Sequence, residues 1–166
     1  MNPSDQSSAA SLREPFTPDS SESTSIPDLP SLGRNRKVLV VDDNVVVLKA
    51  FEAKFKASGF EVILARDTMS AVTEARKRKP DLIVLDINFP PDNSLISLQW
   101  NGLNVLQWLK RFEELSPIPV VVVSGDDAEK SEKKALAAGG SAYFQKPLNF
   151  TAFAEALRRL FRPIPA

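Results

Sequence analysis

Five short runs of β-branched and other apolar residues recur along the chain from Lys37 onward. They are KVLVV, EVILA, LIVL, IPVVVVS and AYFQ, at residues 37–41, 61–65, 82–85, 118–124 and 142–145. Because these runs are largely apolar throughout rather than alternating, both faces of each strand should be buried, as in a parallel sheet covered by helices. The pattern therefore predicts a central parallel sheet of five strands.

The segments between these runs have the three- and four-residue spacing of amphipathic helices. Helices are predicted over about 44–58, 67–79, 103–115, 128–138 and 150–161. Asp67 and Asn149 are suited to N-capping, and Gly59 to ending the first helix. Strands alternating with helices predict an α/β fold, doubly wound as a three-layer sandwich. Ligands of such folds bind beyond the carboxyl ends of the strands.

The first 36 residues show neither the alternation of strands nor the three- and four-residue spacing of helices. They are rich in serine, proline and acidic residues, and their apolar residues, such as Phe16, Ile26 and Leu29, are isolated. A segment of this composition cannot bury enough apolar surface to offset its chain entropy. We expect a disordered tail at 1–36, one domain at 37–162 and a short end at 163–166; contact of the tail's apolar residues with a partner is the less favoured alternative.

Composition narrows the chemistry and the partners. Lysine plus arginine and aspartate plus glutamate number 21 each, so no global basic field favours direct binding of nucleic acid or of an anionic membrane. The absence of cysteine and histidine excludes thiolate chemistry and the commonest general base. No apolar run approaches the roughly 18 residues of a membrane span, and no signal peptide opens the chain. A cytoplasmic protein is expected.

Polar residues stand where four of the predicted strands end. Asp42 and Asp43 follow the first, Asp86 the third, Ser124 ends the fourth and Lys146 follows the fifth. Each has an ordinary explanation alone, as a helix cap, a turn residue or a solvated lysine. Together they occupy one edge of the predicted sheet and belong to the few residue types that handle a phosphoryl group and a hard cation.

The clustered carboxylates at this edge of the sheet predict a bound cation. Three carboxylates about 4–6 Å apart repel one another, and one lysine compensates only part of their charge. Oxygen ligands without histidine or cysteine select Mg²⁺ (or Mn²⁺). We expect Asp42, Asp43 and Asp86 to hold the metal, with the backbone carbonyl of Asn88 as a further ligand.

The remaining groups then acquire roles in phosphoryl transfer. The Asp86 carboxylate is the predicted nucleophile, attacking phosphorus to form an acyl phosphate. Lys146 is expected to pair with one phosphoryl oxygen and the Ser124 hydroxyl to bond another.

In these motifs the sequence resembles the receiver domain of two-component response regulators, over about 37–162. The motifs are VLVVDDN with Asp42 and Asp43, DLIVLDINFP with Asp86, VVVVSGDD with Ser124, and AAGGSAYFQKP with Tyr143 and Lys146. The resemblance implies a flavodoxin-like fold with strand order 2-1-3-4-5. It also implies that a histidine kinase or histidine phosphotransfer protein donates a phosphoryl group to Asp86 with Mg²⁺ bound, after which Ser124 and Tyr143 act as switch residues.

The family also indicates how such a protein works. Receiver domains catalyse only their own phosphorylation and dephosphorylation, so we do not expect an ordinary enzyme. No output module follows the last predicted helix, which suggests a stand-alone, chemotaxis-regulator-like protein that signals by contact with an unknown downstream protein or by self-association. The fourth helix, with the fifth strand and helix, is the expected output face.

Two features depart from the family pattern. Gly140 replaces the usual small residue after Gly139, a minor change. More important, PDNSLISLQW intervenes before Asn101 and Gly102, beside the acceptor site. Packing of the apolar residues of the insertion, Pro90–Trp100, against the third helix is favoured over an exposed contact patch.

Two other functions compete with this interpretation. A phosphatase of the dehalogenase-like class also uses an aspartate nucleophile and Mg²⁺, but it expects an acidic residue at position 88, where this chain has Asn88. A receiver-like binding module that has lost phosphorylation is the second alternative, which the complete set of acceptor-site residues disfavours.

Overall fold

The computed structural model of the chain describes residues 32–88 and 102–162. Five parallel strands form one sheet in the order β2-β1-β3-β4-β5, which confirms the predicted direction and order. The strands are β1 (Lys37–Val41), β2 (Glu61–Ala65), β3 (Leu82–Asp86), β4 (Val120–Ser124) and β5 (Ala142–Gln145). All residues of β3 and β4 are buried, as their unbroken apolar runs require.

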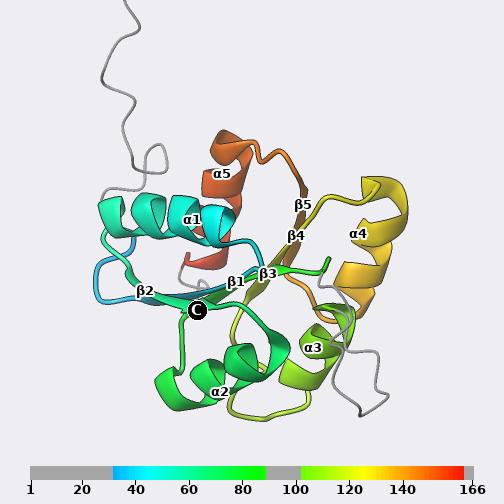
Figure 1. Ribbon diagram of the computed structural model, residues 1–166, viewed down its shortest axis with the longest axis horizontal. Helices are drawn as coiled ribbons and strands as arrows, with labels where there is room; N and C mark the ends of the chain where they lie inside the picture. Colours follow the sequence, from blue (N-terminus) through cyan, green and yellow to red (C-terminus); the bar gives the residue numbers. More distant parts are fainter. Residues whose placement is uncertain (1–31, 89–101, 163–166) are drawn as a thin grey trace, which may run out of the picture.

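Helices cover both faces of the sheet in the predicted flavodoxin-like arrangement. They are α1 (Val45–Ala57), α2 (Thr68–Arg78), α3 (Gly102–Leu109), α4 (Ala128–Ala137) and α5 (Phe150–Leu160). Figure 1 shows α1 and α5 on one side of the sheet and α2 and α3 on the other. Ala135 of α4 packs into the same core as α2 and α3, so α4 belongs to their layer.

The two layers enclose cores of different composition. The core beneath α1 and α5 contains a cluster of phenylalanine rings, with the Phe55 ring 5.2 Å from that of Phe60 and 6.1 Å from that of Phe153 between centroids. The core on the other side is mainly aliphatic, with Leu85 and Leu106 fully buried. Because packed interiors deform little, both cores hold the carboxyl ends of the strands in fixed positions.

The third helix is shorter than predicted. It ends at Leu109 rather than near Leu115, and residues 110–117 form turns. The Lys110 ammonium donates to the carbonyls of Ser116 and Ile118, over 3.0 and 2.7 Å, which satisfies the backbone of this connection. Leu115, 1% exposed, reaches the core from a turn. Its apolar spacing therefore mimicked one more turn of helix.

The folded part begins earlier than the predicted boundary at Lys37. Residues 32–36 form a turn in which the Gly33 N–H donates to the Ser58 carbonyl over 3.2 Å. The Arg36 guanidinium lies 4.4 Å from the centre of the Phe161 ring. The predictions for residues 1–31, for the Pro90–Trp100 insertion and for 163–166 fall outside the described residues. Among the helices of the described ranges, none is long and apolar enough to cross a membrane.

Candidate phospho-acceptor site

The sheet order brings the predicted site residues to one edge. Asp42 follows β1, Asp86 ends β3 and Ser124 ends β4, and these three strands are neighbours in the sheet. Lys146 follows β5, and its backbone N–H donates to the Ser124 carbonyl over 2.7 Å. Parallel strands put all four carboxyl ends on the same side, so residues more than 100 positions apart converge.

Three carboxylates form the centre of the site. Carboxylate oxygens of Asp42, Asp43 and Asp86 lie within 4.8 Å of one another. Asp42 is 2% exposed and Asp86 5%, whereas Asp43 is exposed. The cluster therefore has a buried inner pair and one carboxylate that faces solvent.

Lys146 lies against the inner pair. Its ammonium is 3.0 Å from Asp42 Oδ2 and 3.2 Å from Asp86 Oδ2, and it donates a hydrogen bond to each. Burial lowers the pKa of Lys146, but the hydrogen bond and charge of Asp42, together with those of Asp86, outweigh burial and raise that pKa above its usual value. The lysine is therefore a fixed positive charge at neutral pH.

Asp86 experiences opposing influences. Burial raises the pKa of its carboxyl group, and the negative charge of Asp42 adds to the effect. The Asn88 N–H, which donates to Asp86 Oδ1 over 2.8 Å, and the Lys146 ammonium lower the pKa but do not cancel the increase. A matching bond from the Asn44 N–H to Asp42 Oδ1, also 2.8 Å, orients the other buried carboxylate.

The donor set fits a hard divalent cation. Three carboxylates against one ammonium leave two negative charges uncompensated, and their available ligand atoms are all oxygens. Mg²⁺ and Mn²⁺ bind such oxygens, and the exposed position of Asp43 leaves room for the waters that Mg²⁺ retains. Asp42, Asp43 and Asp86 are the residues that could hold the ion, while a ligand role for the Asn88 carbonyl stays a prediction.

Ser124 bonds to the side chain of Asn88, a residue for which the sequence indicated only a backbone-carbonyl role. Its hydroxyl is fully buried and donates to Asn88 Oδ1 over 2.6 Å, and the Gly125 N–H donates to the same oxygen over 3.0 Å. The Ser124 oxygen in turn accepts from the Asp126 N–H over 3.0 Å. Asn88 follows Asp86 by two positions, a spacing that places alternate side chains of an extended chain on one side and could have indicated this contact.

Tyr143 continues this connection from β5. Its side chain is half-buried, and its hydroxyl donates to the Asp126 carbonyl over 3.3 Å. Asp126 thus bonds through its backbone to both Ser124 and Tyr143. The two predicted switch residues are therefore linked through one residue of the connection between β4 and α4.

Solved structures share this fold. The chemotaxis protein CheY4 of Vibrio cholerae superposes with a TM-score of 0.65 at 22% identity, covering 76% of this chain and 98% of that protein. The receiver domain of the Francisella response regulator 1452 gives a TM-score of 0.64 at 25% identity, covering 76% and 96% of the two chains. The fold is therefore that of known receiver domains.

Sequence similarity extends from the fold to the family. The polar-differentiation response regulator DivK of Brucella anthropi is 34% identical over 123 residues, which are 74% of this chain and 94% of that protein. The DivK protein of Brucella ovis is 35% identical over the same length. Residues 38–158, most of the chain and all the site residues described above, match the response regulator receiver domain. The chain belongs to the family of response regulator receiver domains, which act in phosphorylation-based signalling.

Proposed function

We propose that Asp86 accepts a phosphoryl group from a phosphohistidine of a histidine kinase or phosphotransfer protein, and that this modification controls contact with a downstream protein. The observation that carries the proposal is the position of Asp86: it ends a buried strand, 5% exposed, with Lys146 Nζ 3.2 Å from one carboxylate oxygen and two further carboxylates beside it. Burial of a carboxylate costs folding free energy, and such costs are concentrated at functional sites. The position of Asp86 therefore favours a reactive group.

The transfer is a displacement at phosphorus. An oxygen of the Asp86 carboxylate forms the new P–O bond while the P–N bond to the donor imidazole breaks, and the imidazole nitrogen leaves with the electron pair. The product is an acyl phosphate on Asp86. In the later hydrolysis, a water oxygen attacks phosphorus and the P–O bond to Asp86 breaks, with the electron pair returning to the carboxylate. One proton of the water stays on the released inorganic phosphate and the other passes to solvent.

The surrounding residues position the groups and balance their charge. The Asn88 N–H holds Asp86 Oδ1, which leaves the other oxygen beside Lys146. During transfer, negative charge shifts from the Asp86 carboxylate to the phosphoryl oxygens. The Lys146 ammonium lies close enough to leave the carboxylate and pair with a phosphoryl oxygen. A divalent cation held by Asp42, Asp43 and Asp86 would supply further neutralisation of phosphoryl oxygens. In this account the chain catalyses only its own phosphorylation and dephosphorylation and is no ordinary enzyme.

The donor has an apolar surface available beside the site. Val45 and Val46, at the start of α1 and next to the acidic cluster, are 40% and 75% exposed. Large apolar side chains at this exposure suit a transient protein contact. A phosphohistidine presented by a protein that covers these valines could reach Asp86.

The signal is proposed to leave through the bonds that join Ser124, Asp126 and Tyr143. A phosphoryl oxygen on Asp86 competes with Asn88 for the Ser124 hydroxyl, and a shift of Ser124 changes the backbone that Tyr143 contacts. The affected surface is formed by α4, β5 and α5. We propose that a downstream protein, or a second copy of this chain, binds that surface in the cytoplasm in a phosphorylation-dependent manner.

The test is phosphotransfer from a phosphorylated histidine phosphotransfer domain. Wild-type protein should take the label in Mg²⁺ and lose it slowly, whereas Asp86→Asn and EDTA-treated protein should take none. Glu113→Gln, at an exposed acid in the turns after α3 and outside the carboxylate cluster, is the control and should be labelled normally. Labelling of Asp86→Asn would overturn the proposal, and sustained turnover of a phosphomonoester would favour the dehalogenase-like alternative.

A further inference from the structure

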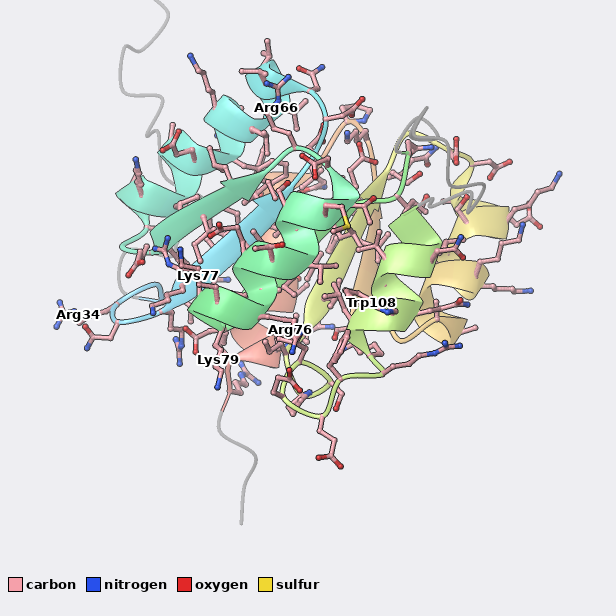
Figure 2. The ribbon with its side chains drawn as sticks, turned by 60° about the horizontal axis from the view of Figure 1, so that its bottom comes forward. Arg34, Arg66, Arg76, Lys77, Lys79 and Trp108 are labelled. Carbon is pink, nitrogen blue, oxygen red and sulfur yellow. The ribbon has the colours of Figure 1, made fainter. Side chains whose placement is uncertain are left out.

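A groove between α2 and α3 lies outside the acceptor site. It has a volume of about 630 Å³ and shares no residue with the acidic cluster. Its lining consists of apolar Met69, Val72 and Trp108, polar Thr73, and charged Arg76, Lys77, Lys79 and Glu114. Figure 2 shows Arg76 near the end of α2 and Trp108 on α3, with Lys79 close to Arg76.

Met69 and Trp108 expose apolar surface in the groove, whereas Val72 is buried. Met69 is 71% exposed, and Trp108 is half-buried with its ring 4.5 Å from that of Phe112. Methionine and tryptophan adapt to irregular apolar side chains and contribute large contact areas. Their exposure in one concave surface indicates a contact with an apolar group.

The positively charged side chains of the groove differ in whether they have an acidic partner. The Arg76 guanidinium lies 3.5 Å from a Glu114 carboxylate oxygen and 5.0 Å from the Phe112 ring centre, so it fastens α2 to the turn after α3. Lys77 and Lys79 are exposed, and within the described residues neither has an acidic partner. These two lysines leave positive charge at one end of the groove.

Lys79 occupies its place at a conformational cost. It caps α2 in the left-handed region, with φ +47° and ψ +68°, and precedes Pro80. Glycine fits this position without strain and is the usual residue there. A lysine at this cap therefore adds a charge to the groove that the fold itself does not require.

We propose that this groove docks an acidic peptide segment of a partner protein, with an apolar side chain against Met69, Val72 and Trp108 and carboxylates against Lys77 and Lys79. Charge complementarity identifies the occupant. The lysines attract acidic groups at one end of the groove, while the Arg76–Glu114 ion pair leaves the rest of its charged lining without net charge, so a continuous polyanion such as nucleic acid would be compensated over only part of its length. A short peptide suits both parts of the groove, because it carries carboxylates for the two lysines and an apolar side chain for Met69, Val72 and Trp108.

The test uses the full chain and a short synthetic peptide in which glutamates flank a Leu-Phe pair. Amide resonances of Thr73 and Lys77 and the Trp108 indole resonance should shift on titration, and added salt should weaken the binding. Lys77→Glu combined with Lys79→Glu should raise the peptide Kd by about tenfold or more. The matched charge change, Lys49→Glu with Lys56→Glu on the exposed side of α1, should leave it within about twofold.

A second variant separates binding from folding. Lys79→Gly removes the charge and the left-handed strain together, so the thermal midpoint should not fall while the peptide binds more weakly. Equal binding by a peptide with lysines in place of the glutamates, equal binding by the double variant, or absence of shifts in the groove would overturn the proposal. The same shifts with a single-stranded RNA oligonucleotide would also overturn it, since the site would then recognise a polyanion.

Discussion

Ser124 Oγ donates a hydrogen bond of 2.6 Å to Asn88 Oδ1, which joins the end of β4 to the residue two positions after Asp86. The buried Ser124 hydroxyl therefore lies close to the acceptor carboxylate of Asp86 but is hydrogen-bonded to Asn88 instead. In the proposed function, phosphorylation changes this partner, so the strength of the bond sets part of the cost of switching.

The Ser124–Asn88 bond should stabilise the unphosphorylated fold. Asn88→Ala leaves the buried Ser124 hydroxyl and the Gly125 N–H without this acceptor, so the free energy of unfolding should fall by about 1–3 kcal/mol. Urea unfolding of Asn88→Ala, Ser124→Ala and the double variant measures the coupling between the two residues, expected at about 0.5–1.5 kcal/mol. A coupling of zero would show that the bond contributes nothing to the resting state.

Lys146 should contribute more than an exposed lysine to stability without divalent ions. Lys146→Met leaves Asp42 and Asp86 facing each other without compensation, so the free energy of unfolding should fall by about 1–3 kcal/mol at neutral pH. Lys56→Met is the control, because Lys56 pairs with Glu52 on the exposed side of α1 and should cost below about 1 kcal/mol. Equal losses in the two variants would mean that the central ion pairs add no stability.

The raised pKa of Asp86 gives a defined pH dependence. Because the folded state holds the Asp86 proton more tightly than the unfolded chain, this group makes the metal-free protein less stable as pH rises above its ordinary pKa of 3.8 and through the raised value. Asp86→Asn should therefore raise the free energy of unfolding of the metal-free protein at pH 7. The gain should shrink as the solution is acidified, and a pH-independent gain would point to another cause.

Divalent cations should reverse this instability. Addition of Mg²⁺ should raise the thermal midpoint of the wild-type protein, since an ion that binds only the folded state stabilises it. Asp43→Asn removes one cluster carboxylate and should weaken the apparent affinity about tenfold, whereas Glu113→Gln, outside the cluster, should respond like wild type. If the apparent Mg²⁺ affinity fell in the control variant and not in Asp43→Asn, the cation would bind at another site.

The first residue of α3 should be sensitive to size because of its contact with the acceptor strand. A Cβ atom on Gly102 would lie 2.3 Å from Ile87 Cα and 2.8 Å from the Asp86 carbonyl oxygen. Gly102→Ala must therefore move this backbone, and we expect a loss of about 1–3 kcal/mol together with slower phosphorylation. Gly125→Ala is the matched control, because no atom lies within 4 Å of its Cβ position. If Gly102→Ala changed neither the free energy of unfolding nor the rate of phosphorylation, α3 could shift without cost.

Much of the fold could be predicted because each strand and helix carries its own periodic signal. The apolar run that ends at Asp86 predicted both the buried β3 and the position of the carboxylate. The end of α3 could not be predicted, because Leu115 has helical spacing but reaches the core from a turn stabilised by the Lys110 side chain. The contact of Asn88 with Ser124 joins residues 36 positions apart and depends on how β3 and β4 pack, information that local patterns lack.

The identity of the modified residue tests most directly whether Asp86 is the phosphoryl acceptor. The purified protein would be treated with a small phosphodonor and Mg²⁺, reduced with borohydride, which converts an aspartyl phosphate to homoserine, and mapped by mass spectrometry. Homoserine is expected at position 86 in wild-type protein and should be absent from Asp86→Asn. Phosphate found instead on a serine, or wild-type protein that retains aspartate at position 86, would contradict it.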